Sequence, residues 1–192
     1  MRILRAADYR RMPWKNGGGE TTEIAVWPEN AGLDDFGWRV SMARVERDGP
    51  FSAFSGIDRT LSILEGEGLR LAIAGQPAVE LRGEGDPFAF PADQPTDSVL
   101  LGGPVTDLNV MTRRGRFKHA VRRVEALEKT EIPSDAKVTM LLCHRGAVDI
   151  AVGTEAGRLG ELDCLVLEGS ESVSARAGRN ASLFLIEIYE AG

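Results

Sequence analysis

A short glycine-rich segment near the start of the chain combines residue types that bind small anions. The segment WKNGGG, residues 14–19, has three successive glycines, whose backbone can approach a ligand closely and expose N–H groups. Lysine adds a positive charge, asparagine a donor and an acceptor, and tryptophan an apolar wall with one N–H. This combination predicts a carboxylate site, and the alternative is a tight turn with a packed tryptophan and a solvated lysine. The candidate ligand-binding residues here are Trp14, Lys15, Asn16, Gly17 and Gly18.

Glycine and proline spacing in the first half of the chain resembles the two motifs of cupin barrels. In those motifs the glycines set the turns between strands, while histidines and a glutamate bind a divalent metal. The scaffold positions are kept by Gly49, Gly68, Gly85 and Pro91. The four metal-ligand positions hold Ser55, Ile57, Leu61 and Thr96. None of these four carries an imidazole or a carboxylate, so the sequence predicts neither a bound metal nor a cofactor.

Polar and basic residues within the apolar segments form a second set of candidates. An arginine offers a planar fork for a carboxylate, although an arginine on a strand usually faces solvent. Arg59 is the best of three, because it shares a strand face with Leu61 if that strand is regular. Two uncharged polar residues in apolar runs would need a partner such as a ligand or water once buried. The set comprises Arg39, Ser41, Arg59, Asn109 and Arg113.

These candidates lie on, or beside, short alternating apolar runs separated by Gly, Pro and Asp. Such runs, with turn signals every 8–12 residues, predict antiparallel strands in a sandwich or barrel. We expect an all-β chain of two cupin barrels (double-stranded β-helices; a bicupin) with few helices. Residues 1–120 would form the first barrel, which holds the pocket, and residues 121–192 a second, mainly structural barrel. The charged connector, residues 113–133, fits either a strand or a short helix.

Composition restricts the partners and the compartment. The 192 residues carry a formal net charge of −6, which disfavours nucleic acid. The chain has no apolar run of membrane-spanning length and no signal-peptide pattern, so we expect a cytoplasmic protein without a membrane partner. Cys143 and Cys164 are expected to be free, buried thiols. His119 and His144, the only histidines, lie in different segments, and we expect structural roles for both.

Three stretches resemble the HutD/Ves family of bacterial cupin-like proteins. They are residues 14–24, beginning with WKNGGG, residues 38–59, beginning with WRVSMA, and DLNVMTRRG, residues 107–115. The resemblance implies a two-barrel cupin fold and a link to histidine utilisation. HutD proteins of this family are thought to regulate histidine breakdown, for example by sensing N-formylglutamate, and Ves proteins are described as stress- or cold-induced.

Two functions therefore compete. The first is a non-catalytic protein that binds a small carboxylate-containing metabolite and regulates histidine utilisation, with no catalytic residue and with a homodimer as a possible assembly. The second is a metal-independent enzyme, an isomerase or lyase, with Lys15 as base and Arg59 as electrophile. A lysine base needs desolvation or a neighbouring cation, and the sequence places neither beside it. A third alternative is a scaffold that mediates only protein contacts.

The altered ligand positions predict that the protein does not retain a transition metal. Serine and threonine oxygens alone form a poor site for zinc, iron, nickel or manganese. Elemental analysis after purification without added metal should find far less than one such ion per chain. One stoichiometric equivalent of any of them would contradict the prediction.

Overall fold

The computed structural model describes residues 1–125, 130–177 and 181–192, which divide into two compact units. The first unit consists of Arg10–Lys118 with Ala191–Gly192, and the second consists of Met1–Tyr9 with His119–Glu190. The sequence-based division at residue 120 thus differs mainly in the nine N-terminal residues, which lie with the second unit. The described residues contain one helix, the 3₁₀ turn η1 (Ala6–Asp8), and no helix that could span a membrane.

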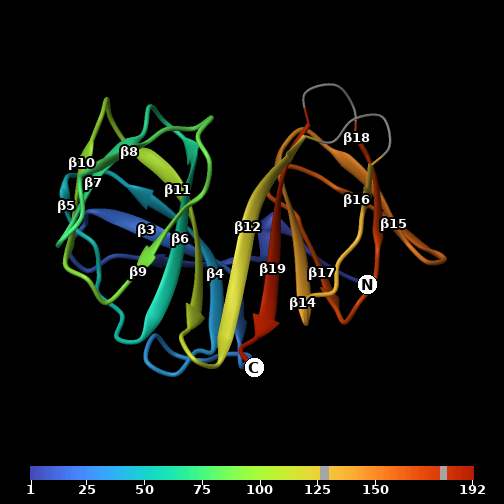
Figure 1. The fold of residues 1–192 in the computed structure, drawn as a ribbon. Helices are drawn as coiled ribbons and strands as arrows, with labels where there is room; N and C mark the ends of the chain where they lie inside the picture. The colour runs from blue at the N-terminus through green and yellow to red at the C-terminus, as the bar shows by residue number, and fades with distance from the viewer. Residues whose placement is uncertain (126–129, 178–180) are drawn as a thin grey trace. The chain divides into compact units, whose positions relative to one another are not determined.

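The first unit is built from two antiparallel sheets (Figure 1). The larger sheet has the order β2-β3-β4-β11-β6-β9, and the smaller has the order β5-β10-β7-β8. The strands of the larger sheet are β2 (Arg10–Pro13), β3 (Gly19–Trp27), β4 (Trp38–Val45), β6 (Ile57–Glu65), β9 (Phe88–Pro91) and β11 (Val105–Arg113). Those of the smaller sheet are β5 (Gly49–Pro50), β7 (Leu69–Ile73), β8 (Val79–Leu81) and β10 (Thr96–Leu100).

Alternating apolar residues hold the two sheets of the first unit together. In β7 the buried residues Leu69, Leu71 and Ile73 alternate with exposed ones, as expected for a strand with one face on a core. They pack in one cluster with Leu61 and Ile63 of β6, so side chains from both sheets mix in the core. A β-sandwich buries its apolar faces in this way, and the prediction of antiparallel strands is confirmed.

The second unit repeats the same plan with other residues. Its five-stranded sheet has the order β1-β17-β14-β19-β12, and its four-stranded sheet the order β13-β18-β15-β16. The first sheet contains β1 (Arg2–Leu4), β12 (Phe117–Glu125), β14 (Val138–Arg145), β17 (Cys164–Glu168) and β19 (Ser182–Glu190). The second contains β13 (Thr130–Ile132), β15 (Val148–Val152), β16 (Glu155–Leu159) and β18 (Val173–Ala177). Its core is almost entirely aliphatic, and Cys143 and Cys164 are free and buried, as expected.

Most of the charged connector is strand in the part that the structure describes, and residues 114–116 form a turn. Within residues 113–133, β12 covers Phe117–Glu125 and β13 covers Thr130–Ile132. The helical alternative is therefore wrong for these residues, because the alternation of Phe117, His119 and Val121 matches the strand period. Residues 126–129 lie outside the described part of the chain.

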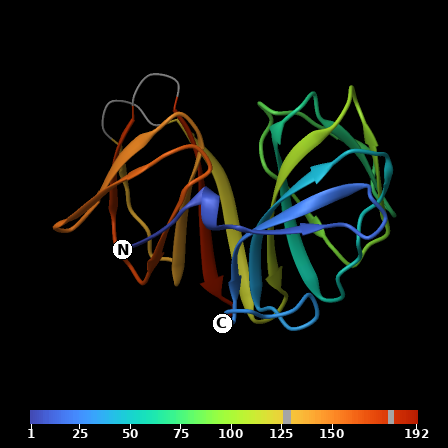
Figure 2. The ribbon, with the colours of Figure 1, turned by 180° about the vertical axis from the view of Figure 1, so that it is seen from behind.

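A buried carboxylate ties the N-terminal segment to the second unit. Strand β1 pairs with β17 in antiparallel register, and Figure 2 shows this segment in dark blue against the second unit. The carboxylate of Asp163 accepts N–H bonds from Ala6 (2.9 Å) and Gly160 (3.0 Å) and pairs with Arg5 (2.7 Å). Burial by itself raises the pKa of Asp163, but these hydrogen bonds and Arg5 outweigh it and hold the pKa below its usual value.

We predict that Asp163→Ala destabilises the second unit by about 2–4 kcal/mol, because two backbone N–H groups and Arg5 lose their acceptor. Urea unfolding at pH 7 measures the change. Asp149→Ala is the matched control, since Asp149 forms an exposed ion pair with Arg158 and should shift stability by less than about 1 kcal/mol. Equal effects of the two substitutions would contradict the assignment.

Candidate functional site

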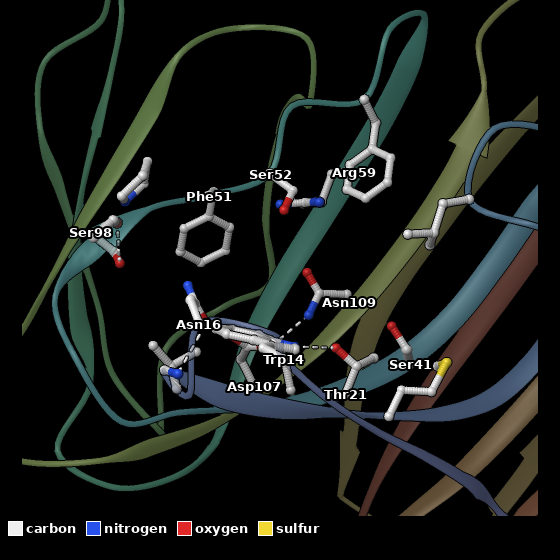
Figure 3. Close-up of a pocket in the computed structure, with 18 of the residues that line it drawn as sticks. Trp14, Asn16, Thr21, Ser41, Phe51, Ser52, Arg59, Ser98, Asp107 and Asn109 are labelled. Atoms are coloured by element: carbon white, nitrogen blue, oxygen red, sulfur yellow. Dashed lines mark hydrogen bonds between the residues drawn. The ribbon is translucent and has the colours of Figure 1, made fainter.

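A cavity of about 770 Å³ lies inside the first unit (Figure 3). Its lining combines buried polar side chains on strands with aromatic and turn residues. Of the residues predicted from sequence, the lining includes Trp14, Lys15, Asn16, Gly18, Arg39, Ser41, Arg59 and Asn109. Gly17 and Arg113 are not part of it. The sequence missed several lining residues, among them Thr21, Phe51, Phe54, Asp107 and Met111.

Strand register brings the polar residues together as cross-strand rows on one face of the larger sheet. Because side chains alternate between faces, residues paired across neighbouring strands point to the same side. The first row is Thr21, Ala43, Asp107 and Ile63. The second row is Glu23, Ser41, Asn109 and Leu61. The third row is Arg39, Met111, Arg59 and Phe90. The polar residues of three rows thus meet at the cavity wall, although they lie far apart in sequence.

Arg59 is a buried cation surrounded by aromatic rings. Its side chain is 4% exposed, and its guanidinium carbon lies 5.1 to 5.8 Å from the ring centroids of Phe51, Phe54 and Phe90. Its hydrogen bond within the described chain goes to the sulfur of Met111, at 3.5 Å, and Nε has no partner there. Burial lowers the pKa of Arg59 to about 10, so the group remains charged at neutral pH. A buried guanidinium without an oxygen acceptor is a strong candidate for binding an anion.

Asp107 is the buried acid of the same wall. Asn109 donates a 2.5 Å hydrogen bond from Nδ2 to Asp107 Oδ1, while Oδ2 has no hydrogen-bond partner among the described residues. Burial is the main cause that raises the pKa of Asp107 to about 7, against the opposing effect of Arg59. The carboxyl group is therefore close to half-ionised near neutral pH, and Arg59 lacks a fully charged counter-ion.

Arg39 and Ser41 have more local partners. Arg39 Nε lies 2.7 Å from Glu23 Oε2, and both side chains are largely buried, so the charge of this arginine is neutralised by a neighbouring strand. Ser41 is 2% exposed and occupies the row between Glu23 and Asn109. Both line the cavity. Arg59 is the other buried arginine of the lining, and unlike Arg39 it has no carboxylate in hydrogen-bonding contact among the described residues.

The glycine-rich segment forms a tight turn at the cavity wall, and the N–H groups of Gly17 and Gly18 are already used. Gly17 N–H donates to the Trp14 carbonyl (3.0 Å), and Gly18 N–H donates to Asn16 Oδ1 (3.0 Å). Gly17 has a φ of +66°, which favours glycine, and a Cβ on Gly19 would collide with the carbonyl oxygen of Arg44. The expectation that Gly17 and Gly18 offer free N–H groups to an anion is therefore wrong, and the turn alternative describes the backbone.

Arg113 has a structural position rather than one at the cavity. It donates from Nε to the carbonyl oxygen of Phe36 (3.0 Å) and from Nη2 to that of Asp34 (2.8 Å). These bonds fix the loop between β3 and β4. The guanidinium of Arg113 thus binds main-chain carbonyl oxygens. From the sequence alone, this role cannot be distinguished from binding a ligand carboxylate.

The sequence pattern could have predicted Asp107 as a cavity-lining residue. Asp107 stands two residues before Asn109 in an otherwise apolar run, so the strand period that places one in the cavity wall places the other there as well. No strand pattern could have predicted the aromatic residues of the cavity wall. Phe51 and Phe54 lie outside regular strands and contact Arg59 only in the folded chain.

Three of the four positions at which cupins hold metal ligands are occupied by core or hydrogen-bonded residues, and the fourth, Ser55, is exposed in a turn. Ile57 and Leu61 are 1% and 0% exposed and belong to apolar clusters, and Thr96 donates its hydroxyl to the Gln94 carbonyl. Within residues 1–125, 130–177 and 181–192, no three His, Cys, Asp or Glu side chains cluster in a way that could hold a metal ion. In the second unit, the His144 ring packs 5.6 Å from that of Phe184.

Comparison with known proteins assigns relatives over nearly the whole chain. The model of the HutD family matches residues 6–185. An uncharacterized 21.2 kDa protein in the hutC 3′ region of Pseudomonas putida is 39% identical over 174 residues, which is 90% of each chain. Protein Ves of Citrobacter koseri is 40% identical over 119 residues, which cover 60% of this chain and 61% of that protein.

Solved structures give the same relationship and the fold. A conserved protein of unknown function from Pseudomonas aeruginosa PAO1 is 36% identical, with a TM-score of 0.91 over 98% of both chains. HutD from Pseudomonas fluorescens SBW25 is 32% identical, with a TM-score of 0.84 over 100% of this chain and 99% of that one. Oxalate decarboxylase from Bacillus subtilis shares only 11% identity, with a TM-score of 0.68 over 99% of this chain and 77% of that one. This likeness supports a cupin-like fold and nothing more.

Asp107 gives the stability of the protein a defined pH dependence. Its folded-state pKa of about 7 lies above that of an aspartate in an unfolded chain, about 3.9, so the folded state binds the extra proton between these values. The corresponding stabilisation is complete below about pH 4 and is lost as the pH rises through about 7. Relative to Asp107→Asn, the wild type should lose up to about 4 kcal/mol of unfolding free energy between pH 4 and pH 8.

Urea unfolding of both proteins across this pH range measures the difference. Asp97→Asn changes an exposed aspartate on β10, and its stability should follow that of the wild type at every pH. Parallel curves for the wild type and Asp107→Asn would show that Asp107 does not titrate in this range.

Proposed function

The chain belongs to the HutD family, and we propose that it is a non-catalytic protein that binds a small carboxylate in the first unit and thereby regulates histidine utilisation. The observation that carries this proposal is the buried guanidinium of Arg59, which has no oxygen acceptor within the described chain and lines a cavity of about 770 Å³. A cavity of this size suits a metabolite rather than a polymer.

Charge and shape at this wall favour a carboxylate. Lys15 and Arg47 add positive charge to the lining, and Arg39 is neutralised by Glu23. A carboxylate bound to Arg59 would form charge-assisted hydrogen bonds where water is largely excluded. The rings of Phe51 and Phe54 would cover the apolar part of the ligand. These features suit an acylated amino acid such as N-formylglutamate, the intermediate suggested by the family resemblance.

The enzyme alternative has less support. Lys15 is exposed in the turn, so it lacks the desolvation that a lysine base requires. Arg59 stays protonated and can orient or polarise a ligand but cannot exchange a proton at neutral pH. Asp107 could exchange one, but it is 0% exposed and its Oδ1 already accepts a hydrogen bond from Asn109. Binding without turnover is the function that this set of groups supports best.

The finer description of the fold is part of the same proposal. Each unit pairs a larger and a smaller antiparallel sheet around its own apolar cluster, which supports two cupin barrels in one chain. Buried polar residues line the cavity of the first unit, whereas the core cluster of the second contains aliphatic residues and a cysteine. We therefore assign ligand binding to the first barrel and a structural role to the second.

A thermal-shift screen with urocanate, formiminoglutamate, N-formylglutamate and glutamate tests the proposal. A ligand present at 100 times its Kd stabilises the native state by about 2.7 kcal/mol, which raises the melting temperature by several degrees. We expect N-formylglutamate to give the largest shift. No shift with any of the four, at millimolar concentration, would overturn the proposed ligand class.

Calorimetry on Arg59→Met then locates the site. Methionine keeps an apolar chain among the phenyl rings and removes the charge, so the barrel should fold while affinity falls about ten- to a hundred-fold. Arg82→Met is the matched control, because Arg82 is exposed and pairs with Glu80 away from the cavity. Binding by Arg59→Met as tight as that of the control would place the carboxylate elsewhere. Incubating wild type with the bound ligand and finding a product by mass spectrometry would favour the enzyme alternative.

A further inference from the structure

We propose that the cavity selects carboxylates that also carry an N–H group, because Asp107 fixes Asn109 with its side-chain oxygen toward the ligand. This inference rests on the proposed function and narrows its ligand class to amino or acylamino carboxylates. Asn109 would bind the ligand directly, whereas Asp107 would act as a positioning residue beside it on β11.

The orientation of the Asn109 amide follows from the chemistry of its partner. Above its pKa, Asp107 is an ionised carboxylate with no proton to give, so its hydrogen bond with the amide must come from the amide Nδ2. Nδ2 of Asn109 lies 2.5 Å from Asp107 Oδ1. The amide oxygen therefore points the other way, and Figure 3 shows it directed from Asp107 toward the side of the cavity where Ser52 and Arg59 lie. No described residue donates a hydrogen bond to this oxygen.

Arg59 and Asn109 are spaced to bind the two ends of one small group. Asn109 pairs with Leu61 across the β11–β6 ladder, and Arg59 is two residues from Leu61 on the same face. Such diagonal neighbours lie roughly 7–8 Å apart between their backbones. A ligand whose N–H is attached to the carbon next to the carboxylate can bridge this spacing with one hydrogen bond at each end. Both residues are more than nine-tenths buried, so each would lose its water when the ligand binds.

Selectivity follows from the cost of leaving a buried acceptor without a donor. A ligand that places an oxygen where the N–H should be brings two acceptors together, and neither can be solvated. Sites built to hydrogen-bond a particular group reject analogues that lack it for this reason. An amide ligand should thus bind more tightly than its ester isostere of the same charge and nearly the same shape.

Isothermal titration of the full chain with N-formylglutamate and with its ester isostere, 2-formyloxyglutarate, tests the inference. The measurements are made at pH 8.5, where Asp107, with its pKa raised to about 7, is a carboxylate. We expect the amide to bind the wild type at least ten-fold more tightly than the ester. In Asp107→Asn the neighbouring amide can donate as well as accept, which frees Asn109 to rotate, so the ratio should fall to within about three-fold of unity.

Two further variants separate this role from general damage to the fold. Thr106→Ala removes a hydroxyl of β11 that donates to Glu65 Oε2 and is not part of the cavity lining, and it should retain the wild-type ratio. Asn109→Leu keeps the approximate shape and removes the acceptor, so it should also bring the ratio near unity, even if Asp107→Asn does not fold.

The outcomes distinguish the inference from the proposed function. Equal affinities of amide and ester for the wild type, both lowered by Arg59→Met, would leave the carboxylate site standing and overturn selection for N–H. A wild-type ratio that survives in both Asp107→Asn and Asn109→Leu would overturn the role given to this pair. Absence of binding by both probes would overturn the proposed function and this inference together.

Discussion

The first unit depends on keeping an arginine charge inside an apolar interior. Arg59 lies among the rings of Phe51, Phe54 and Phe90, where the attraction between cation and ring faces replaces part of its hydration. That replacement is incomplete, because the hydrogen bond it makes in the described chain goes to a sulfur, which is a weak acceptor. A carboxylate ligand would complete it. The same incompletely compensated charge of Arg59 therefore affects both ligand binding and the stability of this cavity wall.

Asp107, the neighbouring acid, affects how far the charge of Arg59 is compensated. Asp107 offers Arg59 a counter-charge, but burial makes that charge costly and leaves the carboxyl close to half-ionised at neutral pH. A fully ionised partner would neutralise Arg59 and reduce its attraction for a ligand, whereas no acid at all would leave the cation alone. Asn109 connects this pair to the cavity, since its amide is held by the acid and its oxygen is free for the ligand. The acid and the amide are thus neighbours on one face of β11, and both line the cavity.

The second unit shows what the same architecture does without such a wall. The apolar cluster between its sheets contains aliphatic side chains and a cysteine. The carboxylate oxygens of its buried acid, Asp163, accept hydrogen bonds from backbone N–H groups and from Arg5. At Asp163 the hydrogen bonds and Arg5 outweigh burial and lower the pKa, whereas at Asp107 burial outweighs Arg59 and the hydrogen bond from Asn109 and raises the pKa. This contrast supports a division of labour between a binding unit and a structural one.

The sequence by itself determined the strand content, the turns and part of the cavity wall. The period of two in the run from Arg59 to Ile63 fixes which side chains share a face, so Arg59 and Asn109 could be named as candidates from the pattern alone. Tertiary structure decided the rest. The order of the strands places Asp107, Asn109 and Arg59 on one wall of the cavity. The folded chain also packs Phe51 and Phe54 against the guanidinium of Arg59, and Arg113 binds the carbonyl oxygens of a loop. The N-terminal nine residues joined the second unit by pairing with β17 across more than 150 positions. Local periodicity sets the direction of a side chain, but its partners are set by strand order and register, which depend on contacts between residues distant in the chain.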